Sequence, residues 1–197
     1  MKLIIGLTAK PGGGKGTFVK LLKEVCNQVC FFPSIGGPRF SDALFDTANL
    51  FGILTSRENL QRLAQYLNEL CPGAMATAMK NKLEKDHNEI KIADGCRWDY
   101  DEKMIREMAG VIVYVNADQK LRYERIKLRN EKNGDAEKTW EKFLEEDSAK
   151  NEIYIEEIGS RADFKIDNNG TLEDYRRQVE EFYQQFVAPL REKNTPH

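Results

Sequence analysis

A run of glycines around one lysine, set between an apolar segment and an amphipathic one, constrains the fold more than any other feature of the sequence. Residues 9–17 read AKPGGGKGT. Before them, residues 2–8 (KLIIGLT) are largely apolar, which is typical of a buried parallel strand. After them, apolar residues recur at helical spacing over residues 16–29. Glycine lets successive backbone N–H groups curl around a phosphate, so strand, loop and helix in this order predict a phosphate-binding site.

The residues of this loop indicate how a nucleotide would be held. Those expected to surround its phosphates are Gly12, Gly13, Gly14, Lys15, Gly16 and Thr17. The helix that begins near Lys15 points its unsatisfied N–H groups at the same anion. Lys15 is expected to bridge the β- and γ-phosphates, while Thr17 offers a hydroxyl to Mg²⁺. Ala9 stands where such loops usually have their first glycine, and the alternative is a glycine-rich turn without a ligand.

The rest of the chain predicts a sheet covered on both faces. Four further segments have the short apolar pattern of strands: residues 30–32, 90–93, 111–115 and 162–166. Helical patterns lie between the strands, and a terminal helix is expected over about residues 172–186. Residues 33–38 (PSIGGP) predict a loop. This alternation favours a three-layer α/β/α fold around a mostly parallel five-stranded sheet.

Length and charge exclude several other classes of protein. A chain of 197 residues predicts one domain over residues 1–197. Its 30 basic and 32 acidic residues exclude a generally basic surface for nucleic acid. No apolar run approaches the roughly 20 residues that span a bilayer, and the first residues do not continue as a signal peptide would. We therefore expect a cytoplasmic protein without a nucleic-acid or membrane partner.

The cysteines favour the same compartment. Cys26, Cys30, Cys71 and Cys96 show neither CxxC spacing nor the density of a secreted disulfide framework. Free thiols in a reduced protein are the expectation, and a metal or redox site is the alternative.

The glycine loop resembles those of two related kinase families. Its ending, GGGKGT, is similar to the GxGKGT ending of adenylate kinase-type loops, and GLTAKPGGGKGT resembles the GLTGxxxSGKS opening of dephospho-coenzyme A kinases. Both families belong to the nucleoside monophosphate kinase-like P-loop phosphotransferases, and the likeness extends thinly over most of the chain. The resemblance implies a P-loop fold that uses ATP and Mg²⁺. It also implies an acceptor-binding insertion at about residues 39–85 and a short lid at about residues 130–150.

An acidic residue at the end of a later strand completes the expected metal site. The segment IKIADGCR, residues 90–97, resembles the strand–Asp–Gly–x–(Pro)–Arg element of nucleotide kinases, without the proline. By that resemblance Asp94 holds Mg²⁺ through water, and Arg97 contacts an acceptor phosphate. The alternative is an ordinary Asp-Gly turn at the end of a strand.

Two kinds of residue compete for the acceptor. Asp42 matches the position of an aspartate that faces the attacking hydroxyl in dephospho-coenzyme A kinases. Nucleotide kinases instead place an arginine nearby to grip the acceptor phosphate, a role open here to Arg39 or Arg57. A structural alternative is a helix N-cap at Ser41 or Asp42.

An arginine-rich helix is expected after the strand at residues 111–115. Arg122, Arg125 and Arg129 are spaced by three and four residues, which places them on one helical face. Such a face resembles the arginine-bearing lid of nucleotide kinases, where Arg125 and Arg129 would neutralise charge on the transferring phosphoryl group. The alternative is a solvated helix paired with its own acids, Glu124 and Glu131.

The last predicted strand ends in a second candidate nucleotide contact. Residues 163–170 (DFKIDNNG) resemble the final strand and Asn-x-Gly turn of these kinases. By that resemblance Asn169 and Gly170 border the adenine base, mostly through backbone groups, and a simple turn is the alternative. Trp98 and Trp140 are expected to be packing residues.

Together these features predict an ATP-dependent phosphotransferase. The favoured acceptor is a nucleoside or deoxynucleoside monophosphate, and dephospho-coenzyme A is the alternative. A non-catalytic nucleotide switch is a third possibility. The string nearest to the guanine-reading motif NKxD is NKLE at residues 81–84, which ends in Glu and precedes Asp94. The sequence indicates neither the acceptor's identity nor the oligomeric state.

Overall fold

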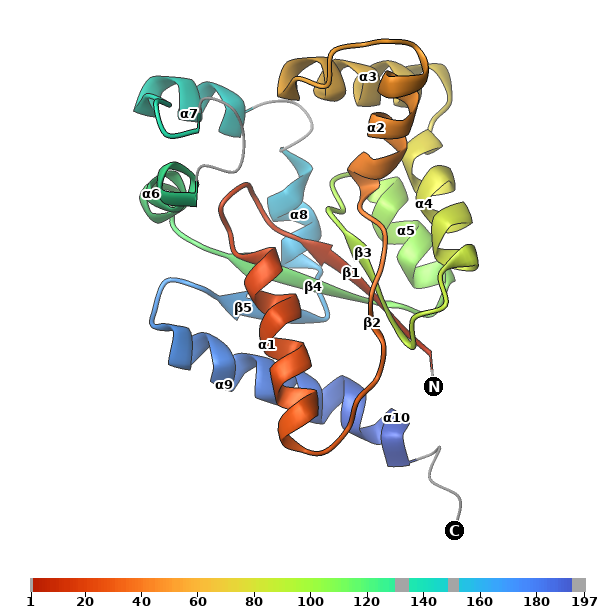
Figure 1. The fold of residues 1–197 in the computed structure, drawn as a ribbon, viewed down its shortest axis with the longest axis vertical. Helices are drawn as coiled ribbons and strands as arrows, with labels where there is room; N and C mark the ends of the chain where they lie inside the picture. The colour runs from red at the N-terminus through yellow and green to blue at the C-terminus, as the bar shows by residue number, and fades with distance from the viewer. Residues whose placement is uncertain (1, 130–134, 149–152, 193–197) are drawn as a thin grey trace.

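A computed structural model describes residues 2–129, 135–148 and 153–192 of the chain (Figure 1). Within these residues the strands form one parallel sheet in the order β2-β3-β1-β4-β5. They are β1 (Leu3–Thr8), β2 (Ile35–Gly36), β3 (Ile90–Asp94), β4 (Val111–Asn116) and β5 (Phe164–Asp167). Leu7 pairs with Asp94, and Thr8 with Tyr114, so the carboxyl ends of the three central strands meet at one edge.

Helices cover both faces of the sheet, which confirms the three-layer α/β/α prediction (Figure 1). One face carries α1 (Lys15–Gln28), α9 (Leu172–Phe182), the π-helical turn η2 (Tyr183–Val187) and α10 (Ala188–Glu192). The other carries α4 (Ala74–Lys85), α5 (Asp99–Glu107) and α8 (Tyr154–Ser160). In Figure 1 the β1–α1 loop has α6 (Gln119–Arg129) and α7 (Trp140–Asp147) on one side, and α2 (Phe40–Leu50) and α3 (Arg57–Leu70) on the other.

Strand alternation divides the core into two halves. Ile5 and Leu7 pack on the α1 and α9 side, where Phe18 meets Phe182 edge to face at 5.2 Å between ring centroids. Ile4 packs against the second cluster on the opposite face of the sheet. The central strand β1 is therefore buried on both faces, which explains why its sequence is nearly continuously apolar.

The prediction of a strand at residues 30–32 is wrong. Cys30 has a φ of 53°, outside the β region, and the edge strand is Ile35–Gly36 within the segment predicted as loop. The Ile90 N–H donates to the Ser34 carbonyl at 3.0 Å, which fixes the register of this strand against β3. A strand of two residues leaves no periodic pattern, and so its position comes from its partner rather than from its own sequence.

Most other predicted elements are confirmed. The predicted strands at residues 90–93 and 111–115 lie within β3 and β4, and that at 162–166 overlaps β5. The stretch before β3 resolves into α2, α3 and α4. Of the proposed lid, the structure describes residues 135–148, whereas residues 130–134 and 149–150 and the C-terminal residues 193–197 lie outside the described part.

Two observations concern the whole described chain. Cys26, Cys30, Cys71 and Cys96 are all free thiols. Among the residues with a described structure, no helix is both long enough and apolar enough to cross a membrane.

Candidate active site

The glycine loop between β1 and α1 adopts a backbone conformation that residues with a side chain would not allow. Gly12 and Gly14 have φ angles of 79° and 107°, in the region that favours glycine. A Cβ on Gly12 would lie 2.6 Å from the backbone oxygen of Arg122. The Gly13 N–H donates to the Lys10 carbonyl at 2.9 Å and closes the turn. The glycines therefore permit both the turn itself and its close contact with α6.

The N-terminus of α1 is open to an anion. Its N-cap is Gly14, so no side chain caps the N–H groups of the first turn. Those groups carry the positive end of the helix dipole toward the loop. Thr17 lies in this first turn and is half-buried. The loop and helix end thus form a cradle of the kind that binds phosphates.

Two residues near the C-terminus hold the loop's carbonyl groups. The Asn168 side-chain amide donates to the Gly13 carbonyl at 2.8 Å, and the Tyr175 hydroxyl donates to the Gly14 carbonyl at 3.1 Å. Burial raises the pKa of Tyr175, so the hydroxyl stays protonated and remains a donor. Sequence reasoning missed both residues, since it singled out Asn169 and Gly170 instead.

Lys15 and Asp94 face each other across the loop. The Lys15 Nζ lies 3.8 Å from the Asp94 Oδ1, and the two side chains are 20% and 32% exposed. Within the described residues, that Asp94 oxygen is buried without a hydrogen-bond partner. A carboxylate oxygen with spare capacity beside the phosphate loop is a ligand that fits Mg²⁺. The residues present therefore suit a magnesium-bound nucleotide.

The turn after Asp94 is fixed from two sides. The Leu7 carbonyl accepts from the Gly95 N–H at 2.8 Å, and Thr8 Oγ1 donates to the Cys96 carbonyl at 2.8 Å. Strand β1 thus anchors this turn as well as the phosphate loop. The turn carries Arg97 into the same cleft as Lys15.

Asp101 is a buried carboxyl that the sequence analysis did not single out. Its Oδ2 accepts from the N–H groups of Arg97 and Trp98 at 2.9 and 3.1 Å, while its Oδ1 is buried without a partner among the described residues. Burial raises the pKa of Asp101 to about 7, against the lowering effect of the two N–H donors. Its place at the third residue of α5 was the available signal, because acids there often cap the preceding backbone.

A cleft of about 440 Å³ extends from the phosphate loop between α2, α3 and α6. Predicted site residues that line it are Gly12, Gly13, Gly14, Lys15, Gly16, Arg39, Asp94, Arg97 and Arg129. Its lining also includes the apolar side chains of Phe40, Phe45, Leu60 and Trp98. The cleft therefore joins a phosphate cradle and three arginines to an aromatic surface.

The other predicted residues lie elsewhere. Asp42 Oδ2 accepts from the Arg39 N–H at 2.8 Å, which is the helix-start geometry of the structural alternative. Arg125 Nη2 donates to the Asn168 carbonyl at 3.0 Å, and within the described residues its Nη1 is buried without a partner. Arg57 begins α3, and its side chain lies outside the described part of the structure.

Asn169, Gly170 and Arg122 are not among the residues that line the cleft. The Asn169 side-chain oxygen accepts from the Asp118 N–H at 2.7 Å, and a Cβ on Gly170 would lie 2.9 Å from an oxygen of Asp174. Arg122 is buried against Asp147 and so is separated from the solvent-facing side of α6. Trp140 packs against Tyr123 and Phe143, as expected, whereas Trp98 packs against the core and also lines the cleft.

Comparisons with known proteins agree with this architecture. A family model described as an AAA domain matches residues 5–154. A UPF0200 protein of Pyrococcus abyssi is 30% identical over 186 residues, covering 90% of this chain and 94% of that protein. A UPF0200 protein of Sulfurisphaera tokodaii is also 30% identical, over 93% and 97% of the two chains.

Solved structures share the fold at low sequence identity. TT1252 from Thermus thermophilus has a TM-score of 0.59 and 20% identity, and the match covers 95% of this chain and 99% of that one. Shikimate kinase from Bacteroides thetaiotaomicron has a TM-score of 0.57 and 14% identity over 93% and 97% of the chains. The overall fold is thus the one found in a small-molecule kinase.

Proposed function

The chain belongs to the AAA-domain family of P-loop proteins and to the UPF0200 proteins, and we propose that it is an ATP-dependent kinase of nucleoside monophosphates. The observation that carries the proposal is the single cleft that joins the phosphate loop to Arg39, Arg97 and Arg129 and to an aromatic wall. A donor cradle with an arginine-lined, partly apolar acceptor space suits a phosphorylated, base-bearing acceptor.

The donor half of the cleft holds ATP. The loop N–H groups and the start of α1 bind its phosphates, and Lys15 contributes positive charge to the β- and γ-phosphates. Bound Mg²⁺ supplies charge neutralisation on the phosphate oxygens. Thr17 and Asp94 hold that ion, a role supported by the buried Asp94 oxygen that has no partner among the described residues.

The acceptor half is suited to a phosphate and a flat ring. Arginines at positions 39, 97 and 129 provide planar donors that match phosphate oxygens. Phe40, Phe45 and Trp98 offer apolar and aromatic surface for a base. Phosphoryl transfer then depends on positioning and charge neutralisation, so a strong general base is unnecessary.

Dephospho-coenzyme A remains the alternative acceptor for one specific reason. Asp42 follows Ser41, which lines the cleft, and a carboxylate there could accept a proton from a ribose hydroxyl. Against this, the Asp42 carboxylate already accepts the Arg39 N–H. A monophosphate acceptor needs no such proton transfer, because its attacking oxygen is ionised.

One experiment separates these functions. Purified protein with Mg·ATP is given each ribo- and deoxynucleoside monophosphate, dephospho-coenzyme A or shikimate, and ADP release is measured, with Lys15→Ala as the inactive control. ADP release that depends on a nucleoside monophosphate supports the proposal. Dependence on dephospho-coenzyme A or shikimate replaces it with that activity, and acceptor-independent hydrolysis indicates a nucleotide switch.

A further inference from the structure

We infer that Arg122 and Asp147 are positioning residues that fasten the outer side of the phosphate loop to α7 and so set the protein's affinity for nucleotide. The inference rests on the proposed nucleotide binding, and it assigns a role to an ion pair outside the cleft. Arg122 touches the loop at the Pro11 carbonyl, and Asp147 holds the Arg122 guanidinium in place. Both act through the backbone of the loop.

The pair is buried and fully engaged. Arg122 Nη1 and Nη2 donate to the two carboxylate oxygens of Asp147 at 2.6 and 2.8 Å. The Arg122 and Asp147 side chains are only 5% and 3% exposed. The Gln119 side-chain amide donates to the same carboxylate at 3.0 Å, and the Arg122 guanidinium lies 5.5 Å from the centre of the Phe143 ring. Such a bidentate pair is geometrically specific.

The carboxylate remains charged at neutral pH. Burial alone would raise the pKa of Asp147, but hydrogen bonds from Arg122 and Gln119 outweigh it and keep the pKa below its ordinary value. The Lys10 Nζ adds a second positive neighbour at 3.9 Å. The pair is therefore an ionic contact throughout the physiological range.

Arg122 also contacts the phosphate loop at two places. Its Nη1 donates to the Pro11 carbonyl at 3.3 Å, and its backbone oxygen lies 2.6 Å from where a Cβ of Gly12 would be. A glycine-rich loop has many accessible conformations, and ordering it on binding would oppose nucleotide affinity. By holding the loop at Pro11 before the nucleotide arrives, the pair removes part of that cost.

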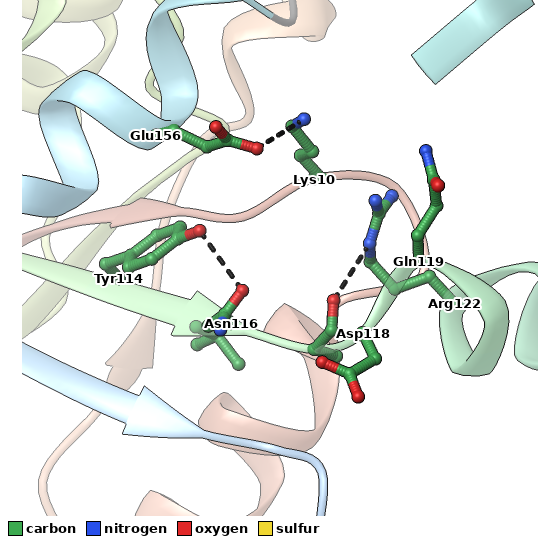
Figure 2. Close-up of a pocket in the computed structure, with 9 residues that line it drawn as sticks. Lys10, Tyr114, Asn116, Asp118, Gln119, Arg122 and Glu156 are labelled. Atoms are coloured by element: carbon green, nitrogen blue, oxygen red, sulfur yellow. Dashed lines mark hydrogen bonds and ion pairs between the residues drawn. The ribbon is translucent and has the colours of Figure 1, made fainter. Parts of the chain in front are cut away.

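A second, weaker fastening lies beside the first. Figure 2 shows Lys10 pointing toward Glu156 of α8. Both residues line a cavity of about 290 Å³, together with Gln119 and Arg122. The Lys10 Nζ lies 2.7 Å from Glu156, whose side chain is 68% exposed. Solvent screens an exposed pair far more than a buried one. The buried pair therefore dominates the positioning of the loop.

The test is direct binding of Mg·ADP by isothermal titration calorimetry, with folding checked by circular dichroism. In Asp147→Asn an amide donor would face Arg122 or Gln119, and the dissociation constant is expected to rise at least tenfold. The matched control is Glu145→Gln on the same helix. The Glu145 side chain is 70% exposed, and its carboxylate lies 2.8 Å from the Lys142 Nζ. Its dissociation constant is expected to stay within twofold of the wild type.

Arg122→Lys provides a second variant that keeps the charge but loses the bidentate geometry. It should also weaken binding, and the double variant should lose less than the sum of the two single effects, because both substitutions break one contact. In steady-state assays the KM for ATP should rise while the KM for the acceptor stays unchanged.

The binding measurements distinguish failure of the proposed function from failure of the role inferred for Arg122 and Asp147. Wild-type protein that does not bind Mg·ADP overturns the proposed function, and this inference with it. Wild-type binding with unchanged affinity in Asp147→Asn or Arg122→Lys overturns the inference alone, even if the melting temperature falls, because the pair is then merely structural. If Asp147→Asn does not fold, Arg122→Lys decides the matter.

Discussion

At the scale of single residues, the site leaves charged atoms with capacity for a ligand. The 3.8 Å between Lys15 Nζ and Asp94 Oδ1 exceeds hydrogen-bond length, so this pair is an electrostatic contact with room for other partners. The Asp94 oxygen has no hydrogen-bond partner among the described residues, although it is buried. Leaving such an oxygen unsatisfied costs free energy, and a bound ion would recover that cost.

Asp94→Asn tests this role. The amide keeps the size of the side chain but loses the charge that holds the metal's water shell, so half-maximal activity should need at least several-fold more Mg²⁺. The melting temperature should change little. Magnesium titrations of initial rate, read beside thermal unfolding, check both points. An unchanged magnesium requirement would return Asp94 to the role of a turn residue.

Asp42→Asn distinguishes the two acceptors. If the acceptor is a monophosphate, turnover should fall less than tenfold, whereas removal of a general base for a hydroxyl costs roughly 10²–10⁴-fold. Arg39→Ala should instead raise the KM for the acceptor, because it removes from the cleft a guanidinium that donates hydrogen bonds to the acceptor's phosphate. A thousandfold loss of turnover in Asp42→Asn, with Arg39→Ala almost silent, would favour dephospho-coenzyme A.

At the scale of elements, the site depends on how turns are held together. The β3–α5 turn that presents Arg97 is fastened by β1 on one side and by the buried Asp101 carboxyl on the other. The carboxyl prefers its protonated form in the folded state, because burial outweighs the two N–H donors. The stability of this turn is therefore linked to pH.

Asp101→Asn should reduce that pH dependence. A pKa raised from 3.8 to about 7 gives a stabilising contribution that is present below about pH 4 and is lost as the pH rises toward 7. Between those two pH values the free energy of unfolding of the wild type should fall by up to roughly 1.4 kcal/mol per pH unit because of this carboxyl. The variant should lack this fall. Urea unfolding at pH 4.5 and 8 measures the effect, with Asp99→Asn as an exposed control on the same helix. Equal pH slopes in wild type and Asp101→Asn would contradict the assignment.

Elements also show where sequence patterns succeed and fail. The strands β1, β3 and β4 and the glycine loop could be predicted because each leaves a local pattern of apolar residues or glycines. The edge strand β2 could not, because two residues carry no period. The sequence analysis missed Asn168 and placed Arg122 on an arginine-rich face, for another reason. Their partners Gly13 and Pro11 lie 155 and 111 residues away, a separation at which spacing has no meaning.

At the scale of the whole molecule, the core beneath the loop supports the site. Phe18 is fully buried directly after Thr17, and it joins α1 to α9 through Phe182. The position of the phosphate cradle therefore depends on packing between α1 and α9 on this face of the sheet.

Phe18→Ala should destabilise the protein by about 3–5 kcal/mol, because it leaves a cavity between α1 and α9. Phe32→Ala is the matched control, since Phe32 is 74% exposed and its loss should cost no more than about 0.5 kcal/mol. Denaturant unfolding measures both. Similar losses in the two variants would mean that the contact between α1 and α9 contributes little.

Asn168 and Tyr175 hold the carbonyls of Gly13 and Gly14, from 155 and 161 residues further along the chain. A ribosome therefore makes the glycine run long before it makes the residues that fasten the run. A nascent chain that stops before Asn168 contains the complete phosphate-loop sequence but lacks both of these contacts. The loop of such a chain is therefore held by two hydrogen bonds fewer than the loop of the folded protein.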